Sequence, residues 1–452
     1  MTNDIISSFG IKQEDIELLT STRKNGTLTI RIRLVNRGVR CQACGKYIRK
    51  IKDYRHHLIR NSVFISEPCV IDYSARRFLC PYCGKTTSEP NPFTDRFRNI
   101  STDTVDNVLS LLKKYNETFS SVARATQLST TKVMQIFDTY VQPKRKKFSS
   151  SICLDEFYFS RKRRKKYAFL ILDFTKGNII DILESREKHK ISSYFYSIPI
   201  EERKLVKYVS IDMNDIYRDI AKTYFPHALV CADPFHVLKH LSEMLDLVRL
   251  RVLRRYEQDK KSDEYYLLKY QKHLLFSDIS DDITTVKKNH HFRYSITDRQ
   301  KLEMMLMLDE ELREAYELKD SYLLFNRVDY DSKTREQVFL AIVNRMTDSG
   351  INEMVRAGNT LFHWKEEILN SFCTDCRWKK VDGKKVQIFY RVSNGPIEGR
   401  NKYIKMILKL ANGYSNFERF RNRCMYSLNK FEQRSDEPVD HEVTRHFKKP
   451  RE

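Results

Sequence analysis

The sequence predicts a multidomain α/β protein, and three observations support this fold class. The chain has 452 residues, more than one hydrophobic core usually holds. Two cysteine pairs and a stretch of helical periodicity precede residue 148, which predicts small N-terminal domains. Short apolar runs then alternate with helical segments up to residue 232, which predicts a mixed β-sheet core. The hydrophobic fraction of 41% excludes a disordered chain.

The chain is strongly basic, with a formal net charge of +23. A field of that sign attracts polyanions, so nucleic acid is the expected partner. No stretch approaches the roughly 18 apolar residues of a membrane-spanning helix. The N-terminus lacks the basic start and apolar core of a signal peptide. We therefore expect a cytoplasmic protein without a membrane partner, in which ten cysteines serve as thiols or metal ligands and not as disulfides.

Residues 1–100 are predicted to form a zinc-ribbon domain. Weak alternation at residues 27–35 predicts a strand or hairpin that leads into the cysteines. Cys41 and Cys44 form one CxxC turn and Cys80 and Cys83 a second, each followed by a glycine that tolerates the left-handed conformation such a turn requires. Together they supply four thiolates for one structural Zn²⁺, with an inserted hairpin between them. Two unrelated reduced pairs are the alternative.

The other six cysteines carry weaker signals. Cys373 and Cys376 form a third CxxC, but it lacks the glycine and a partner pair, so coincidence is favoured over metal binding. The remaining four are interpreted as ordinary buried thiols: Cys69, Cys153, Cys231 and Cys424.

Residues 101–147 are predicted to form a helix-turn-helix domain that ends in a basic linker at 143–147. Apolar residues recur at helical spacing from 105 to 137. Ala123 is small where two helices would cross, and Ser129 is a good N-cap for the second helix. The side chains that would face a DNA groove are Thr130, Thr131, Lys132 and Gln135. An ordinary helical hairpin is the competing interpretation.

Residues 148–235 are predicted to form the first part of the catalytic core. Strands are expected at about 151–159, 166–174, 178–184, 206–211 and 228–232, with helices before and after the fourth strand. The basic run at 161–166 joins the first two strands. It would either grip phosphates or form a solvated turn.

The rest of the chain is predicted to be mainly helical. Residues 236–384 read as a charged helical insertion without strands, followed by a strand at 385–390. A helical block from about 395 to 431 completes the last part of the core, 385–435. Residues 436–452 are expected to be a flexible tail.

Three acidic residues have the placement that a two-metal phosphoryl-transfer site requires. Asp155 and Asp212 each follow an apolar run that predicts the end of a central strand, and Glu398 opens a late helix. Their oxygens suit Mg²⁺, which prefers oxygen ligands and keeps several waters. An aspartate at a strand end is, however, common without such a role.

Asp212 has two rivals for the second position, Asp215 and Asp233. His236 lies three residues beyond Asp233. This pair either assists the site or caps the helix that starts there.

Glu398 lies two residues after Pro396, a favoured first-turn residue, with Ser393 or Asn394 as the cap. The simpler interpretation is that Glu398 forms an i,i+4 ion pair with Lys402 on a solvated face. The functional interpretation is that Glu398 is a metal ligand beside a phosphate-binding row of Lys402, Lys405 and Lys409. The opposite stripe is expected to pack on the sheet: Ile397, Ile404, Leu408 and Ala411.

At these residues the chain resembles bacterial insertion-sequence transposases of the ISL3 family. The resemblance covers almost the whole chain and rests on 154–157, 210–213, 232–237, 393–401 and 413–417. It implies a zinc ribbon, a helix-turn-helix and a ribonuclease-H-like core whose three catalytic acids are Asp155, Asp212 and Glu398. It also implies that the helical stretch is an insertion between the second and third acids. Pro234 stands where the family often has arginine.

The resemblance implies a transposase that binds the terminal inverted repeats of a mobile element. With two Mg²⁺ or Mn²⁺ ions it would hydrolyse a phosphodiester and then transfer the new strand end. Double-stranded element ends and target DNA would be its partners, bound by a homodimer or higher oligomer in the nucleoid of a bacterium. The alternative is a non-catalytic DNA-binding regulator derived from a transposase. A simple structure-specific nuclease is a third class, which would not need both N-terminal domains.

Overall fold

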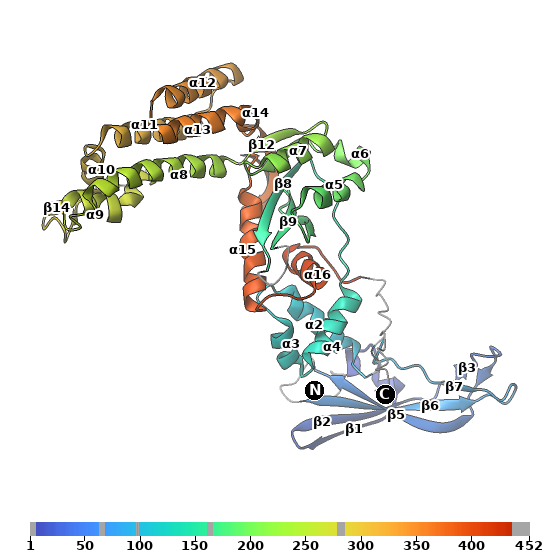
Figure 1. Cartoon of the computed structure of the whole chain (residues 1–452). Coiled ribbons are helices and arrows are strands. Elements are labelled where there is room, and N and C mark those ends of the chain that lie inside the picture. The colour runs from blue at the N-terminus through green and yellow to red at the C-terminus, as the bar shows by residue number, and fades with distance from the viewer. Residues whose placement is uncertain are drawn as a thin grey trace, which may run out of the picture. The chain divides into compact units, whose positions relative to one another are not determined.

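The computed structural model describes residues 6–62, 68–95, 97, 99–160, 166–277 and 285–435 (Figure 1). The chain forms two compact units, Met1–Lys144 with Lys402–Glu452, and Arg145–Asn401. We call them unit 1 and unit 2. The basic run at 161–166, apart from Lys166, and the tail at 436–452 lie outside the described residues. Among the helices that are described, none has the length and apolar character needed to cross a bilayer.

Unit 1 contains a five-stranded sheet with strand order β1-β2-β6-β5 and β7 beside β6. The strands are β1 (Ile16–Lys24), β2 (Thr27–Leu34), β5 (Ile51–Asn61), β6 (Cys69–Leu79) and β7 (Thr86–Ser88), preceded by the 3-10 turn η1 (Gln13–Asp15). Alternation along β2 buries Leu28, Ile30 and Ile32 on one face. The hairpin expected near 27–35 is therefore confirmed as β1–β2. The hairpin expected between the cysteine pairs is β5–β6.

Unit 1 also contains the helices α2 (Thr102–Lys113), α3 (Phe119–Thr126), α4 (Thr130–Tyr140) and α16 (Phe417–Leu428). The expected cap is confirmed, because the Ser129 side chain accepts from the Lys132 backbone N–H. Thr118 and Ser121 form a capping box at the start of α3. Tyr426 of α16 belongs to the same buried apolar cluster as Val108, Val122 and Ile136.

Helices α2 and α16 cap each other's C-terminal ends with cationic side chains, of which Arg423 is buried and Lys113 is half-buried. Arg423 of α16 donates to the carbonyls of Leu112, Lys114 and Glu117, at the end of α2 and just beyond it. Lys113 of α2 donates to carbonyls at and after the end of α16, those of Tyr426, Asn429 and Glu432. These carbonyls have no partner within their own helix, and a cation there is favoured by the helix dipole. Helix α16 is thus packed with α2, α3 and α4 in unit 1.

Unit 2 is built on a five-stranded sheet of order β10-β9-β8-β11-β12. The strands are β8 (Ser151–Tyr158), β9 (Tyr167–Asp173), β10 (Ile179–Leu183), β11 (Tyr208–Ile211) and β12 (Leu229–Ala232). β8, β9 and β10 are antiparallel, whereas β8, β11 and β12 run parallel. All five expected strands are confirmed. The helices before and after β11 are α5 (Lys188–Tyr196), α6 (Ile200–Arg203) and α7 (Asp215–Tyr224).

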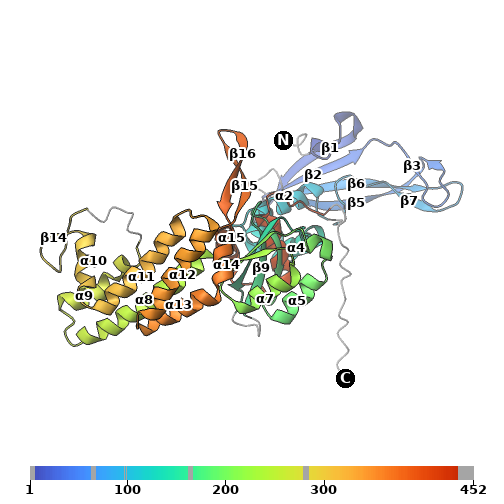
Figure 2. The same cartoon turned by 90° about the horizontal axis from the view of Figure 1, so that it is seen from above.

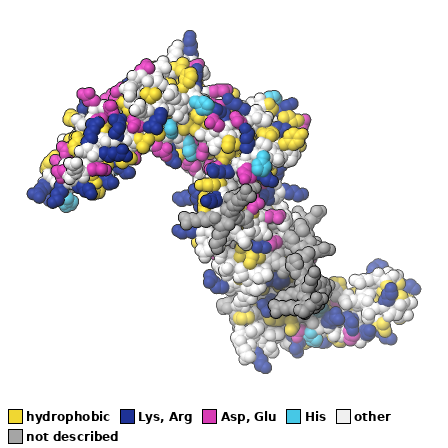
Figure 3. All heavy atoms as spheres, viewed as in Figure 1, with side chains coloured by type: hydrophobic (Ala, Val, Ile, Leu, Met, Phe, Trp, Pro, Cys, Tyr) yellow, Lys and Arg dark blue, Asp and Glu magenta, His cyan; other side chains and the backbone are white. Residues whose placement is uncertain are grey.

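The helical part of unit 2 shares one continuous apolar core with this sheet. Its helices lie side by side in Figures 1 and 2. They are α8 (Pro234–Leu253), α9 (Asp263–Tyr270), α10 (Asp298–Leu306), α11 (Glu310–Arg327), α12 (Ser332–Asp348), α13 (Asn352–His363) and α14 (Lys365–Asn370), with short 3-10 turns η2 (Arg254–Tyr256) and η3 (Lys272–Leu275). On the face shown in Figure 3, basic and acidic side chains interleave over these helices. Ion pairs such as Arg251 with Glu311 are examples.

The expectation of no strand between 236 and 384 is wrong at two places. β13 (Lys287–Lys288) pairs with β14 (Ser295–Ile296), and β15 (Thr374–Val381) pairs with β16 (Lys384–Arg391). β15 escaped prediction because its sequence has little apolar alternation, which is the main strand signal in a sequence. The strand expected at 385–390 is confirmed as β16.

The final helical block consists of α15 (Gly395–Leu410) and α16, separated by a turn with positive φ at Asn412 and Gly413. The first residues of α15 belong to unit 2 and the remainder to unit 1. Ile397, Ile404 and Leu408 on its predicted apolar stripe are buried.

Replacing Arg423 by methionine should destabilise unit 1. The change leaves three carbonyls without their charged donor, a loss of about 3 kcal/mol. The melting temperature of the full-length protein's first transition should fall by about 6–12 °C. Lys430→Met, which removes a charge from an exposed residue at the end of α16, is the matched control and should melt like wild type. Equal melting of both variants would contradict the capping role.

Candidate active site and metal centres

Three aspartates lie in one row across three neighbouring parallel strands. Ser210 of β11 pairs with Cys153 of β8 on one side and with Cys231 of β12 on the other. Two residues beyond each of these stand Asp155, Asp212 and Asp233. Because alternate residues of a strand share a face, the register directs all three carboxylates to the same side of the sheet.

Asp155 does not end its strand, as the sequence had suggested. It lies within β8, opposite Leu170 of β9. The strand continues because β9 pairs with β8 as far as Tyr158, whereas the paired residues of β11 end at Cys153. Asp155 therefore stands just past the end of the parallel ladder, not past the end of the strand. Asp212 follows the last residue of β11, as expected.

Asn394 joins two of these carboxylates. Its backbone N–H donates to Asp233 Oδ1 at 2.8 Å, and its side-chain Nδ2 donates to Asp212 Oδ1 at 2.9 Å. Asn394 is fully buried and directly precedes α15. Its side chain is turned to Asp212 and was considered from the sequence only as a helix cap.

Asn401 holds the first aspartate of the row. Its Nδ2 donates to Asp155 Oδ2 at 2.5 Å. Asn394, Glu398 and Asn401 are four and three residues apart, so they share one face at the start of α15. Sequence reasoning missed both asparagines as site residues, although this spacing was available as a signal.

His236 lies between two aspartates. Its Nδ1 is 3.1 Å from Asp212 Oδ1 and 3.0 Å from Asp233 Oδ2. The ligand atoms of these three residues lie within 4.8 Å of one another, close enough to share a metal ion. Asp233 occupies the N-cap position of α8, but its side chain makes no capping bond there and contacts His236 instead.

Burial and the charge of neighbouring carboxylates raise the pKa values of Asp155, Asp212 and Glu398. Burial, followed by the charge of Asp212, raises the pKa of Asp155 to about 7. Burial is also the main cause of the raised pKa of Asp212, about 6, against which His236 and Asn394 act. The pKa of Glu398 is raised by burial and by the charge of Asp233. Crowded carboxylates of this kind are stabilised by a bound divalent cation.

The donor set fits a hard divalent ion. Carboxylate oxygens are the ligands that Mg²⁺ and Mn²⁺ prefer. In addition, the side-chain oxygens of Asn394 and Asn401 are buried without a hydrogen-bond partner. Buried polar atoms of this kind usually require one, from protein, water or an ion.

The three predicted acids are not drawn into a single cluster. The close group consists of Asp212, Asp233 and His236. Asp155 and Glu398 lie outside this group but interact electrostatically with it, Asp155 with Asp212 and Glu398 with Asp233. Asp215, the other rival, is engaged elsewhere, since it pairs with Arg218 and His363. The lysines predicted to follow Glu398 along α15 are all exposed: Lys402, Lys405 and Lys409.

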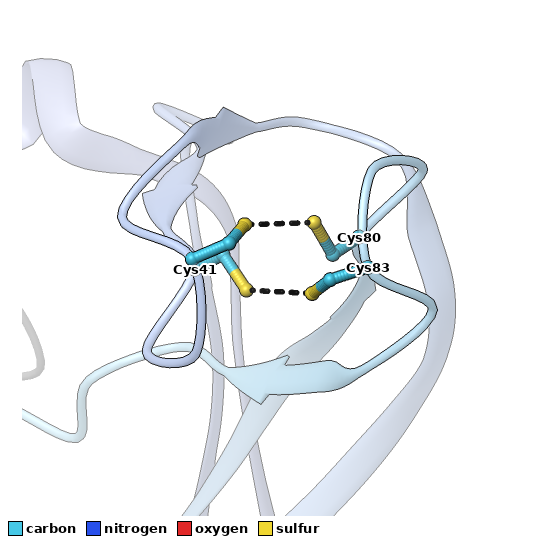
Figure 4. A group of neighbouring side chains, drawn as sticks. Cys41, Cys80 and Cys83 are labelled. Atoms are coloured by element: carbon cyan, nitrogen blue, oxygen red, sulfur yellow. Dashed lines mark hydrogen bonds between the residues drawn. The ribbon is translucent and has the colours of Figure 1, made fainter.

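The four N-terminal cysteines form a second centre, in unit 1. Cys41 and Cys44 lie on the turn between β3 (Val39–Arg40) and β4 (Tyr47–Ile48), and Cys80 and Cys83 on the turn between β6 and β7. Both turns use the same bonds: Gly45 N–H donates to the Cys41 carbonyl and Gly84 N–H to that of Cys80. Both glycines have positive φ, as predicted. Figure 4 shows that the two turns face each other.

Sulfur spacing at this centre suits zinc. The Cys41 and Cys83 Sγ atoms lie 3.6 Å apart and those of Cys44 and Cys80 3.5 Å apart. Tetrahedral thiolates about 2.3 Å from zinc would be about 3.8 Å apart. Among the described residues, neither Cys373 nor Cys376 belongs to a group of three metal-ligating side chains. The four cysteines expected to be simple buried thiols are buried.

The side chains predicted to face a DNA groove lie at the start of α4 and differ in exposure. Thr131 is exposed, while Thr130, Lys132 and Gln135 are half-buried. Lys132 Nζ donates to Gln135 Oε1 at 2.8 Å and lies over the Phe97 ring. These side chains are therefore preorganised at the start of α4.

Comparison with known proteins identifies relatives of this chain. Residues 152–424 match the family model of ISL3-type transposases, described simply as a transposase. The chain is 22% identical over 408 residues to the transposase of insertion sequence element IS1001 from Bordetella parapertussis, an alignment that covers 87% of this chain and 90% of the relative. It is 31% identical over 100 residues to the transposase of IS1557 from Mycobacterium tuberculosis, covering 22% of each.

One equivalent of zinc should copurify with the full-length protein, held by the four thiolates of unit 1. Cys80→Ser should lose most of the zinc and lower the melting temperature, because metal binding contributes folding free energy to such a small domain. Cys376→Ser is the matched control and should retain both. Elemental analysis and thermal unfolding test this, and less than about half an equivalent of zinc in the wild type would contradict it.

Proposed function

The chain belongs to the ISL3 family of transposases, and we propose that it binds the terminal inverted repeats of its own mobile element and cuts and joins DNA there with divalent metal ions. The observation that carries the proposal is the row of carboxylates on parallel strands, backed by two buried amides. We further propose a ribonuclease-H-like core, supported by the strand order with three antiparallel strands followed by two parallel additions.

Asp155, Asp212 and Glu398 would hold the metal ions. When bound, two such ions lower the pKa of the attacking water or 3′-hydroxyl and stabilise the leaving oxygen. Asn401 orients Asp155 and donates a hydrogen bond that favours its ionised form, and Asn394 does the same for Asp212. These bonds position the carboxylates before the DNA arrives, which is how a rigid site limits reorganisation during the reaction.

Asp212 is a better second ligand than Asp233. Its side chain is 22% exposed, whereas that of Asp233 is 2% exposed. Both oxygens of Asp233 are already engaged, Oδ1 by Asn394 and Oδ2 by His236. The contacts of Asp212 described above all fall on Oδ1. We propose that Asp233 and His236 support Asp212 from behind.

DNA recognition is proposed for unit 1. The zinc ribbon, at residues 1–100, and the helix-turn-helix, at 101–147, would bind the element ends, and the lysines of α15 would contact phosphate. The predicted domains 148–235, 236–384 and 385–435 would then form the catalytic core and its insertion. A non-catalytic regulator would need the DNA-binding parts alone, so the maintained network around the acids favours an enzyme.

Removing one negative charge from any proposed ligand should abolish cleavage but leave DNA binding nearly unchanged. The variants are Asp155→Asn, Asp212→Asn and Glu398→Gln, each about as damaging as the triple variant if the acids act as a unit. The assay is cleavage of labelled DNA carrying both element ends, in Mg²⁺ or Mn²⁺. Ca²⁺ should support binding with little chemistry.

Two controls make this test decisive. Glu201→Gln, at an exposed residue of α6, should cleave normally. Asp233→Asn should retain part of the activity. Full activity in Asp212→Asn with none in Asp233→Asn would move the second ligand to Asp233. Wild-type binding without cleavage under every metal condition would favour the regulator.

Recognition by α4 predicts a separate effect on binding. The double variant Lys132→Ala, Gln135→Ala should bind element ends about tenfold more weakly, as expected for the loss of a base or phosphate contact. Lys114→Ala, at the exposed end of α2, is the control. Titration by fluorescence anisotropy measures both, and equal affinities would exclude α4 as the reader.

A further inference from the structure

β15 and β16 form an isolated two-stranded ribbon in unit 2. Their eight residue pairs run without a shift from Thr374 with Arg391 to Val381 with Lys384. The two-residue turn has positive φ at Asp382 and Gly383, the tight turn that suits a twisted hairpin. No third described strand pairs with it, and Figure 2 shows it standing out from the helices of unit 2.

The base of the ribbon is firmly fixed in unit 2. The Arg391 guanidinium donates to Ser371 and Asn326 and stacks 3.7 Å from the centre of the Phe372 ring. On the other strand, Asp375 accepts hydrogen bonds from the hydroxyl groups of Ser150 and Ser151. Such anchoring holds an otherwise marginal two-stranded structure in one direction.

The ribbon carries an excess of positive charge. Residues 374–391 contain six basic residues and two acidic ones. Two of these residues, Asp375 and Arg391, are bound at the base, which leaves five basic residues and one acidic residue, Asp382, along the rest of the ribbon. By contrast, acidic and basic side chains are mixed over helices α8 to α14 (Figure 3). The ribbon also exposes Phe389 by 65% and Val381 by 45%.

We propose that the β15–β16 ribbon is a DNA-binding element that holds a duplex next to the carboxylates. This inference rests on the proposed function and adds a contact surface outside the N-terminal readers. Its charge is complementary to phosphate, and the major groove of B-form DNA is wide enough for a two-stranded ribbon. Only three residues separate Arg391 from the start of α15, so bound DNA would be fixed relative to Glu398.

The test compares two lysine pairs in the full-length protein. Lys384→Gln with Lys385→Gln removes two charges from the ribbon. Lys260→Gln with Lys261→Gln removes two from the loop before α9, where both lysines are exposed. Binding of a duplex that carries an element end is titrated at several salt concentrations, with Ca²⁺ in place of Mg²⁺ so that no cleavage is needed.

The ribbon variant should bind roughly tenfold more weakly than the control, and its slope of log affinity against log salt should be smaller by about 2. Equal affinity and slope for the two variants would overturn the proposal. Altered sedimentation of the DNA-free ribbon variant would also overturn it, because the ribbon would then join two copies of the chain. If the ribbon variant binds DNA more weakly but the wild type never cleaves, the DNA-binding role of the ribbon is supported and the proposed catalysis is refuted.

A second measurement does not depend on the stability of the lysine variant. A photoreactive phenylalanine analogue at position 389 should crosslink to the labelled duplex. The same analogue at Phe362, 58% exposed on α13, should crosslink far less. Equal crosslinking at the two positions would overturn the proposal.

Discussion

Crowding of negative charge at one edge of the unit 2 sheet is the constraint on which the rest of the site depends. Parallel pairing of β8, β11 and β12 brings Asp155, Asp212 and Asp233 into one row, where burial and the neighbouring carboxylates raise the pKa values of Asp155 and Asp212. A sheet buried on both faces keeps the carboxylates from separating. Neutral amides and a histidine then stabilise the charges that remain without adding negative charge.

These stabilising groups come from distant parts of the chain. Asn394 and Asn401 are about 240 residues after Leu154 and Asp155, yet they contact them across the site. The strands β9 to β12, the helices α5 to α14 and the β15–β16 ribbon all lie in this interval, so the contacts of Asn394 and Asn401 with the sheet close a very long loop. A contact of such sequence separation has a large entropic cost, which the continuous apolar core of unit 2 offsets.

Unit 1 is divided among several small apolar cores, each of which can contribute only limited stability. Its helices depend on a segment from the far end of the chain, because Arg423 and Lys113 satisfy carbonyls of each other's helices. Its cysteine turns pack against only a small apolar cluster, formed by Val39, Ile48, Ile51 and Phe78, so metal binding is the expected main source of their stability. The stability of unit 1, which is proposed to bind DNA, therefore depends on capped carbonyls and on metal binding as well as on burial of apolar side chains.

Local patterns in the sequence determined the five strands of unit 2, the helices α2 to α4 and the two cysteine turns. Periodicity, caps such as Ser129 and positive-φ glycines such as Gly45 act over a few residues, so they can be read without a structure. They also singled out Asp155, Asp212 and Glu398. Strand register, the contacts of Asn394 and Asn401, the pairing of β15 and the role of α16 in unit 1 were decided only in the tertiary structure. Each depends on residues far apart in the chain, and such pairings leave no periodic signal in a single sequence.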